Sequence, residues 1–349
     1  MMYAPLAKDP LAAIEAIVTG DVDGLSVATS GSTGNPRNVL ISARAIRASA
    51  FATVGRLGGP GSWLLALPPS RIGGALVAIR AGLTEQPLTI MPEGSFTAEA
   101  FARAAAMVPP GRRYVSLVPT QVIRLMDSDL GRDALALFDA VLVGGAAFGD
   151  GKRPANAVET YGMTETTGGC VYDGVALPDV EVAIADDDRI LITGATLADG
   201  YDDGDTSAWV THDGVRWLHT GDLGRWHGGK LEVLGRSDDV IITGAHKVHP
   251  VVVERAIAAL DGAIGGAGNM AVVGVDDAEW GKRVVVVVES AQTELSVEDL
   301  RDWLRDTLPN YALPRDLVTA RSLPRTAGGK IDRRAAAILA TQALSHRST

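Results

Sequence analysis

The sequence predicts an α/β protein with a large N-terminal domain of helix-wrapped sheets, a β-rich subdomain and a small α+β C-terminal domain. The chain has 349 residues, about twice the usual size of one domain. Up to about residue 143, strand-length apolar runs alternate with helical stretches, and after about residue 175 short strands follow one another. A compact mixed pattern of about 110 residues ends the chain, which is enough for a separate domain.

The composition excludes several classes of protein. Apolar residues make up 46% of the chain, which excludes intrinsic disorder. The formal net charge is −10, whereas nucleic-acid binding needs a basic surface, so we expect no nucleic-acid partner. No apolar run approaches the roughly 20 residues of a membrane helix, and the N-terminus lacks the order of a signal peptide. We therefore expect a cytoplasmic protein without membrane insertion. The single cysteine, Cys170, excludes an internal disulfide.

The N-terminal domain is expected to hold a parallel sheet wrapped by helices. Ser42 and Thr97 suit the first position of a helix because their hydroxyls can accept a hydrogen bond from its first turn, and Gly58 can end one. Strands are expected at 25–29, 62–67, 87–91, 114–118 and 139–143. Helices are expected at 11–19, 42–57, 72–83, 97–107 and 120–126.

The later elements are richer in short strands. Turns of Gly, Asp and Asn separate expected strands at 180–184, 189–193, 209–211, 216–219 and 230–234. This pattern indicates the β-rich subdomain. After Gly235 and Arg236 the pattern becomes mixed. Helices are expected there at 251–260, at 297–308 after the capping residue Ser296, and from 332, with strands at 271–275, 284–289 and 317–320.

The first stretch that can carry chemistry is the loop Thr29–Arg37 (TSGSTGNPR), which follows the first expected strand of the domain. Its hydroxyls and backbone N–H groups can surround phosphate oxygens, and Arg37 can neutralise them. A Walker A loop would need Gly-Lys followed by Ser or Thr, and this loop has no such run. The alternative interpretation is a flexible surface turn.

Three further stretches carry polar groups of the same kind. Tyr161–Gly169 (YGMTETTGG) offers a ring that can stack on a base and a carboxylate, Glu165, that can hold Mg²⁺. Asp222 can bind a ribose diol, and Arg236 can reach the same sugar or a phosphate. Lys330 follows two glycines, so its charge can be delivered at one step of a reaction. Each has a plain alternative: a polar loop, a hairpin turn or linker, and a solvated basic turn.

The order and spacing of the four stretches together resemble the adenylate-forming superfamily of acyl-CoA ligases, peptide-synthetase adenylation domains and luciferases. The resemblance covers Ala28 to Arg333. Two stretches, Arg56–Pro68 and Tyr161–Gly174, resemble its o-succinylbenzoate–CoA ligase subgroup of menaquinone biosynthesis, in the short actinobacterial form. The resemblance implies a large AMP-binding domain at 1–236 and a small mobile domain at 237–349, with the hinge at Asp238.

The resemblance also implies a site for MgATP. Lys330 would be the lysine needed for adenylation, Thr164 would contact the α-phosphate, and Glu165 would hold Mg²⁺. Arg37 stands where the family usually has lysine. The implied ATP-binding residues are Thr29, Ser30, Gly31, Ser32, Thr33, Gly34, Arg37, Gly144, Gly145, Ala146, Tyr161, Gly162, Asp222 and Arg236.

The implied reaction has two halves. A carboxylate of 2-succinylbenzoate attacks the α-phosphate, giving an acyl-adenylate and pyrophosphate, and the CoA thiol then displaces AMP. In the second half the small domain would rotate and bring in Gly244, Ala245, His246 and Lys247. Arg80 would bind the second carboxylate of the substrate, because an unpaired charge in an apolar pocket is costly. Arg71, at a position where the family commonly has histidine, would be a second ligand of that carboxylate or would reshape the pocket wall. The alternative for Arg80 is a surface residue of its helix.

Two other functions stay open from the sequence. One is a different acyl- or aryl-CoA ligase of the same fold. The other is an inactive nucleotide-binding relative, which the arginine at position 37 favours and the presence of Lys330 opposes. No tightly bound prosthetic group is expected, and the resemblance leaves a homodimer open.

Overall fold

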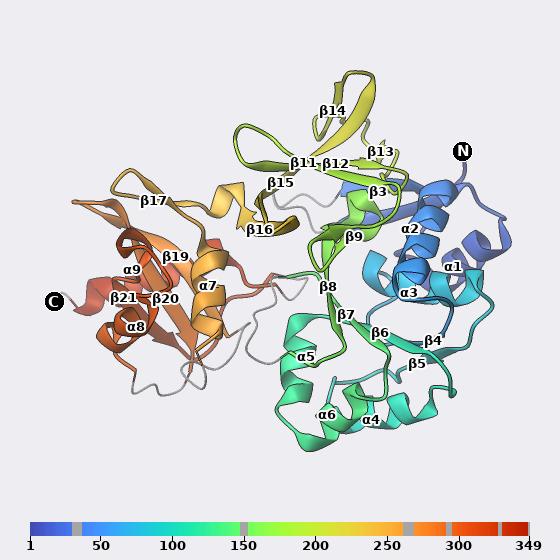
Figure 1. Cartoon of the computed structure of the whole chain (residues 1–349), viewed down its shortest axis with the longest axis horizontal. Coiled ribbons are helices and arrows are strands. Elements are labelled where there is room, and N and C mark those ends of the chain that lie inside the picture. The colour runs from blue at the N-terminus through green and yellow to red at the C-terminus, as the bar shows by residue number, and fades with distance from the viewer. Residues whose placement is uncertain (30–36, 147–152, 261–268, 291–294, 327–329, 348–349) are drawn as a thin grey trace. The chain divides into compact units, whose positions relative to one another are not determined.

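The computed structural model describes residues 1–29, 37–146, 153–260, 269–290, 295–326 and 330–347 (Figure 1). The chain forms two compact units. The large unit comprises Met1–Gly145, Pro154–Thr220 and Trp226–Glu232, and the small unit comprises Ala146–Arg153, Gly221–Arg225 and Val233–Thr349. The division at residues 236 and 237 stays a prediction.

A seven-stranded sheet forms the centre of the large unit, in the order β10-β9-β8-β7-β6-β4-β5. The strands from β4 to β8 run parallel, whereas β9 and β10 are antiparallel additions at one edge. Every residue of β4 and β7 is buried, which is why their sequences, SWLL and AVLV, are almost wholly apolar. The bounds are β4 Ser62–Leu65, β5 Leu88–Ile90, β6 Arg113–Leu117, β7 Ala140–Val143, β8 Ala157–Met163, β9 Gly168–Tyr172 and β10 Val175–Ala176.

Helices cover this sheet, with α1–α3 above the strands and α4–α6 below them in Figure 1. The expected caps are present: the Ser42 hydroxyl accepts a hydrogen bond from Ala45 N, and the Thr97 hydroxyl accepts one from Ala100 N. The bounds are α1 Pro10–Thr19, α2 Ala43–Arg56, α3 Ile72–Leu83, α4 Ala98–Met107, α5 Pro119–Met126 and α6 Asp129–Leu135.

A second, four-stranded sheet brings together segments that are far apart in sequence. It has the order β1-β2-β3-β13, so residues near 200 pair with residues near 40. The bounds are β1 Tyr3–Pro5, β2 Gly24–Thr29, β3 Arg37–Ser42 and β13 Gly200–Tyr201. This pairing decides which side chains surround Arg37.

The β-rich segment forms a third sheet, of five strands. Its order is β11-β12-β15-β14, and β16 pairs with β15. Strand β15 is far longer than the expected strand at 216–219 and contains Asp222, so the alternative interpretation of a hairpin turn at 220–222 does not hold. The bounds are β11 Val180–Ile184, β12 Arg189–Gly194, β14 Trp209–His212, β15 Val215–His227 and β16 Lys230–Arg236.

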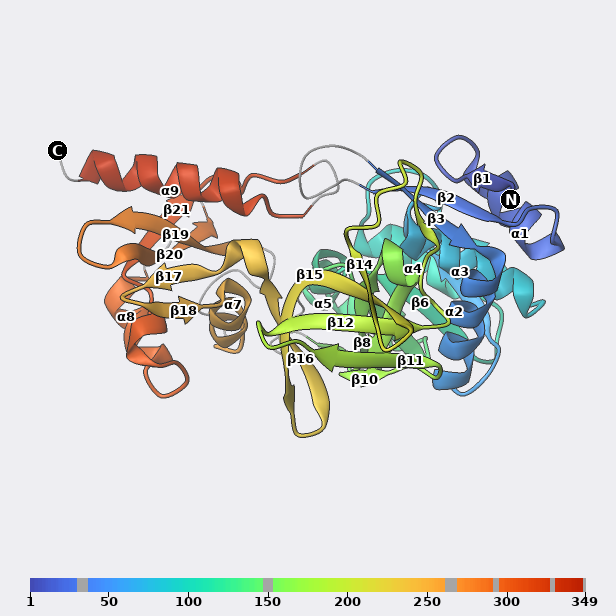
Figure 2. The ribbon, with the colours of Figure 1, turned by 90° about the horizontal axis from the view of Figure 1, so that it is seen from above.

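The small unit is a five-stranded sheet with helices on both faces, and Figure 2 shows α9 along one side of it. The valines of β20 alternate: Val284, Val286 and Val288 pack with the buried residues of α7 and α8, while Val285 and Val287 pack with those of α9. The bounds are β17 Ile241–Thr243, β18 His246–Val248, α7 Pro250–Ala258, β19 Met270–Asp277, β20 Gly281–Glu289, α8 Val297–Leu304, β21 Asp316–Ala320 and α9 Arg333–Arg347.

Candidate functional site

Glu165 and Thr164 lie in a short 3₁₀ turn, Thr164–Thr166, that follows β8. The alternative interpretation, a polar loop, does not hold for Tyr161, Gly162 and Met163, which belong to the strand. Buried hydroxyls fix the turn. The Thr166 hydroxyl accepts a hydrogen bond from Met163 N (2.9 Å), and the Thr167 hydroxyl donates to Thr196 O (2.7 Å). The backbone that carries Glu165 is thus held from both sides.

The Glu165 carboxylate has a partner that the sequence did not reveal. The hydroxyl of Tyr201, in β13, donates a hydrogen bond to Glu165 Oε1 at 2.9 Å. Burial raises the pKa of the Tyr201 phenol, and the neighbouring Glu165 carboxylate raises it further. The hydroxyl therefore keeps its proton and remains a donor across the neutral pH range.

Arg37 begins β3 and is surrounded by groups from the segment after β13. Its Nε donates to Asp203 Oδ2 at 3.0 Å, and its Nη2 pairs with Asp205. The guanidinium carbon lies 4.1 Å from the centre of the Tyr201 ring. The hydrogen bond from Arg37 lowers the pKa of Asp205 to about 2, so this carboxylate is ionised above pH 4. The same Tyr201 side chain therefore touches both Arg37 and Glu165.

The residues predicted for the adenine lie on neighbouring strands. Gly144 follows β7, and the Thr160 hydroxyl, one residue before Tyr161 in β8, donates to Val143 O at 3.2 Å. A Cβ atom on Gly144 would lie 2.4 Å from Thr160 Oγ1, so only glycine allows this approach. The structure brings Gly144 and Tyr161 to adjacent strand ends, where ligands bind in sheets of this kind.

Arg80 is buried in α3, only 3% exposed, so the surface alternative is wrong. Its guanidinium carbon lies 5.5 Å from the centre of the Trp63 ring. Among the described residues, neither Arg80 Nε nor Trp63 Nε1 has a hydrogen-bond partner. Burial lowers the pKa of Arg80, the neighbouring Tyr172 partly offsets this shift, and none of the described carboxylates pairs with the guanidinium. A buried cation without a counter-ion is a group that an anionic ligand would stabilise.

Arg71 does not join Arg80. It is the exposed residue that precedes α3, nine residues before Arg80 and therefore about 14 Å away along the helix axis. Its assignment to the second carboxylate stays a prediction without support from this arrangement.

Within the small unit, Arg236 lies between two predicted site residues. Its Nη1 is 3.8 Å from Asp222 Oδ1, and its Nη2 is 3.4 Å from Asp238 Oδ2. Arg236 is the last residue of β16, and Asp238 lies in the 3₁₀ turn Ser237–Asp239 that follows it. The Arg236 guanidinium therefore links Asp222, which is predicted to bind the ribose, with Asp238, the predicted hinge residue.

The segments of Lys330 and the hinge meet in the same unit. Lys330 is exposed, and its carbonyl accepts a hydrogen bond from Thr326 N at 2.8 Å. Three residues later, at the start of α9, the Arg333 Nε is 3.2 Å from Asp239 Oδ2. Arg333 also pairs with Glu254 of α7. The beginning of α9 is therefore anchored to the residue after Asp238.

The predicted CoA loop is the turn between β17 and β18. Gly244 and Ala245 have φ of 52° and 65°, in the left-handed region. Gly244 lies against Trp280, since a Cβ there would be 2.7 Å from Trp280 Cε3. The His246 ring stacks on Tyr311, with centres 4.2 Å apart and an angle of 8° between planes. His246 and Lys247 are exposed and accessible to a ligand.

Part of the predicted phosphate loop, Ser30 to Gly34, lies outside the described residues. Beside this part of the loop, the Thr29 hydroxyl donates a hydrogen bond to the Arg37 carbonyl oxygen at 3.2 Å. Ala146 is exposed and belongs to the small unit. These assignments stay predictions.

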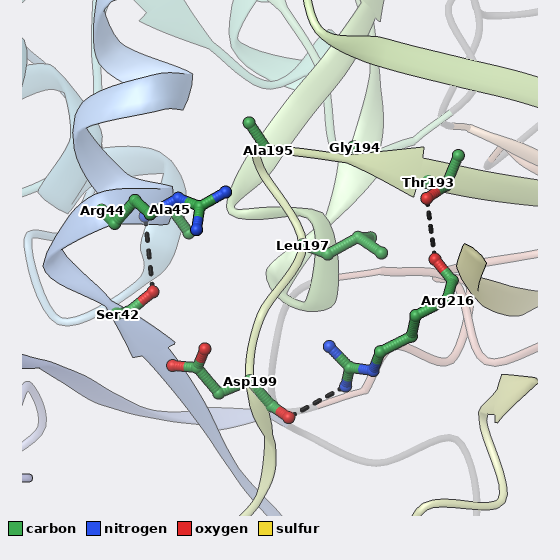
Figure 3. Close-up of a pocket in the computed structure, with 9 residues that line it drawn as sticks. All are labelled: Ser42, Arg44, Ala45, Thr193, Gly194, Ala195, Leu197, Asp199 and Arg216. Carbon is green, nitrogen blue, oxygen red and sulfur yellow. Dashed lines mark hydrogen bonds between the residues drawn. The ribbon is translucent and has the colours of Figure 1, made fainter. Parts of the chain in front are cut away.

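A pocket with a volume of about 310 Å³ lies elsewhere in the large unit, between the start of α2 and the end of β12 (Figure 3). Arg216 lines it, but its guanidinium already donates to Ala198 O (2.8 Å) and Asp199 O (2.9 Å). No residue predicted for the site lines this cavity. We assign it no function.

The described residues contain neither a helix that could span a membrane nor a metal-binding group of side chains. None of their helices is long and apolar enough to cross a membrane. No group of three or more His, Cys, Asp or Glu side chains among these residues is arranged to hold a metal ion.

The missed residues are Tyr201, Asp203 and Asp205. They lie 164 or more positions after Arg37 in the chain, and only the pairing of β13 with β3 brings them to it. The run of Asp202 to Asp205 is an acidic signal in the sequence, but nothing local indicates its basic partner.

Comparison with known proteins identifies the class. Residues 27–201 match the AMP-binding enzyme family, and residues 253–330 match the AMP-binding enzyme C-terminal domain. The chain belongs to the AMP-binding enzyme family. The matched ranges include most of the residues described above, from Arg37 and Glu165 to Lys330.

Particular relatives are similar over most of the chain. A probable 2-succinylbenzoate–CoA ligase of Mycobacterium tuberculosis (strain CDC 1551 / Oshkosh) is 40% identical, over 89% of this chain and 83% of that protein. A 2-succinylbenzoate–CoA ligase of Listeria monocytogenes serotype 4b (strain F2365) is 30% identical, over 95% and 73%. A solved structure of an arginine-to-lysine variant of E. coli MenE with bound OSB-AMS has a TM-score of 0.73 at 26% identity, over 91% of this chain and 68% of that one.

Proposed function

We propose that the chain is an AMP-forming 2-succinylbenzoate–CoA ligase of menaquinone biosynthesis. Membership of the AMP-binding enzyme family and the names of the similar ligases from Mycobacterium tuberculosis and Listeria monocytogenes support the reaction. The choice of acid rests on one observation: the buried guanidinium of Arg80 has no anionic partner among the described residues.

The argument from Arg80 to a diacid is electrostatic. 2-Succinylbenzoate has two carboxylates, one of which is activated while the other must be neutralised where water is largely excluded. Burying an unpaired carboxylate or an unpaired guanidinium is costly, whereas bringing the two together satisfies both. A simple aryl or fatty acid has no second carboxylate and would leave the Arg80 charge unpaired. Arg80 therefore favours a dicarboxylate over a monocarboxylate.

In the first half-reaction the protein positions reactants and neutralises charge. Tyr161 would stack on adenine beside Gly144, Asp222 would bind the ribose, and Thr164 would contact the α-phosphate. The substrate carboxylate attacks the α-phosphate and pyrophosphate leaves, so no protein nucleophile is needed. Lys330 would sit between the attacking carboxylate and the α-phosphate, where negative charge gathers.

Glu165 is suited to magnesium because it is a hard oxygen donor on a fixed backbone. When bound with ATP, the ion neutralises phosphate charge. Arg37 is the cation that the resemblance places at the terminal phosphates, and in this structure its guanidinium is paired with Asp203 and Asp205. The family usually has lysine at that position, and arginine keeps the charge.

In the second half-reaction the CoA thiol attacks the acyl carbon and AMP leaves. Rotation at Asp238 would withdraw Lys330 and bring the Gly244–Lys247 turn to the acyl-adenylate. The left-handed conformations of Gly244 and Ala245 suit a backbone that approaches a ligand closely.

The test is a comparison of acids with the purified protein, ATP, Mg²⁺ and CoA, following pyrophosphate release and thioester formation. The panel holds 2-succinylbenzoate, the two analogues that each lack one carboxylate (4-oxo-4-phenylbutanoate and 2-butanoylbenzoate), benzoate and a fatty acid. We expect kcat/KM for the diacid to exceed every monoacid at least about tenfold.

Three outcomes of this panel differ in meaning. A monoacid that exceeds the diacid more than tenfold overturns the substrate and leaves another acyl- or aryl-CoA ligase. No pyrophosphate release with any acid indicates an inactive nucleotide-binding relative. In Arg80→Met the advantage of the diacid over its analogues should disappear, whereas the exposed Arg44→Met serves as a control and should keep it.

A further inference from the structure

Tyr201 contacts both charged side chains that we assign to the nucleotide, and it does so with different parts of the ring. Its hydroxyl donates to Glu165 Oε1 at 2.9 Å, and its face lies 4.1 Å from the guanidinium carbon of Arg37. Glu165 and Arg37 carry opposite charges. Glu165 lies in the short turn that follows β8, and Arg37 is the first residue of β3. One side chain therefore links the acidic and the basic side of the proposed phosphate region.

The ring of Tyr201 is itself held. Strand β13 pairs with β3, which sets Tyr201 opposite Val39, two residues from Arg37. The Trp209 ring meets Tyr201 edge-on, with centres 4.9 Å apart, and the Arg216 guanidinium lies 4.7 Å from the Trp209 ring centre. Packing on two sides fixes the direction of the hydroxyl.

The segment that follows Tyr201 completes the arrangement around Arg37. The Asp203 carboxylate accepts a hydrogen bond from Arg37 Nε, and the Asp205 carboxylate pairs with Arg37 Nη2. Asp202 accepts a hydrogen bond from the Asn38 side chain at 2.7 Å. A lysine ammonium has no planar fork that could meet two carboxylates and an aromatic face at once. The arginine at position 37 thus matches the residues of this particular chain.

We propose that Tyr201 is a positioning residue for the nucleotide: its hydroxyl orients Glu165 towards the metal-bound phosphates, and its ring orients Arg37. This rests on the proposed ATP-dependent function. A hydrogen bond to Oε1 fixes the carboxylate rotamer and directs the other oxygen, so the group is preorganised before the ion arrives. Tyr201 touches neither acid substrate nor reacting atoms in this role.

The first experiment removes only the hydroxyl. In Tyr201→Phe the ring remains, so contact with Arg37 is kept while Glu165 loses its donor. We expect the Mg²⁺ concentration for half-maximal pyrophosphate release to rise about 3- to 10-fold, with KM for ATP at saturating Mg²⁺ changed less than about twofold. Tyr3→Phe is the matched control: its hydroxyl also donates to a carboxylate, Asp199 Oδ2 at 2.8 Å, in the same sheet.

A second measurement does not depend on turnover. Calorimetric titration with the non-hydrolysable analogue AMPCPP, with and without Mg²⁺, gives the gain in affinity that the ion provides. This gain should shrink about 3- to 10-fold in Tyr201→Phe and stay unchanged in Tyr3→Phe. Tyr201→Leu removes the ring as well, so KM for ATP should rise there beyond the value in Tyr201→Phe.

The outcomes separate this inference from the proposed function. If wild type releases pyrophosphate and Tyr201→Phe keeps the wild-type dependence on Mg²⁺ in both measurements, the positioning role is overturned and the function stands. If no acid supports turnover but AMPCPP binds with an Mg²⁺-dependent gain that Tyr201→Phe reduces, the function fails and the positioning role stands. A wild type that does not bind AMPCPP overturns both.

Discussion

Arg80 combines a full positive charge with 3% exposure, and this combination gives opposite predictions for stability and activity. In Arg80→Met a buried charge is replaced by an apolar side chain of similar length. Such replacements are often neutral or stabilising by about 1–4 kcal/mol, so we expect the ligand-free large unit to unfold at higher urea concentration. The kcat/KM for the diacid should fall at least about 30-fold, because the second carboxylate loses its partner.

Urea unfolding followed by circular dichroism and the pyrophosphate assay check the two parts of this prediction. A variant that is both less stable and less active would contradict it, since that result would mean that Arg80 stabilises the fold. Arg44→Met, on the exposed start of α2, should change neither quantity.

The Lys330 side chain is exposed, so its replacement should not disturb the packing around it. Lys330→Ala should slow formation of the acyl-adenylate about 10²–10³-fold, the cost of one lost preorganised donor. Thioester formation from added acyl-adenylate and CoA should remain near wild type, since the lysine acts only in the first half. Single-turnover measurement of each half-reaction checks this, with Lys282→Ala, an exposed lysine paired with Asp276, as the control.

At this scale the sequence indicated the residues that keep their chemistry in any context. Arg80, Glu165 and Lys330 could be singled out as candidates by residue type, and the resemblance to the adenylate-forming superfamily implied their roles, which stay predictions. Tyr201 and Asp203 could not be singled out, because their role depends on the pairing of β13 with β3. Arg71 was named from the resemblance as a second ligand of the carboxylate or a residue of the pocket wall, and α3 separates it from Arg80.

Helix α3 allows a prediction at the scale of one element, from two neighbouring glycines. A Cβ on Gly74 would lie 2.2 Å from the Pro68 carbonyl oxygen, whereas on Gly73 the nearest atom would be Leu67 Cδ1 at 3.5 Å. Gly74→Ala should therefore destabilise by about 1–3 kcal/mol, since the backbone before α3 must move. Gly73→Ala should be neutral or stabilising by up to about 1 kcal/mol, because alanine favours the helix.

Thermal unfolding of the two single variants checks this. Equal effects would contradict the close approach of α3 to the turn that precedes it. Arg80 lies on the same helix, so Gly74→Ala should also weaken selection of the diacid, while Gly73→Ala should leave it unchanged.

The elements that the sequence predicted well are those with strong patterns. α3 has the expected bounds because its run of apolar residues is long, and α4 begins after the capping hydroxyl of Thr97. Strand β8 was missed because all of its residues are half-buried and its sequence, AVETYGM, shows no clean alternation. α6 was missed because it is seven residues long with a glycine near its middle.

Among the described residues, each of the two units contains buried hydrophobic clusters of its own. One cluster of the large unit contains Ile46 from α2, and one of the small unit contains Leu300 from α8; both side chains are fully buried. Each unit is larger than the roughly 40 residues below which a core needs disulfides or metals. We therefore expect each unit to unfold cooperatively by itself.

Calorimetric unfolding should accordingly show two transitions, and single core variants should identify them. Ile46→Ala should lower the transition of the large unit, and Leu300→Ala that of the small unit, each with a loss of about 2–5 kcal/mol in its own unit. Leu130→Ala, on an exposed side chain, should move neither. If both transitions shift together in each core variant, the two units fold as one cooperative body and the predicted division at residue 236 fails. If they shift separately, Lys330 belongs to a unit that can be stable while it changes position, which the two half-reactions require of it.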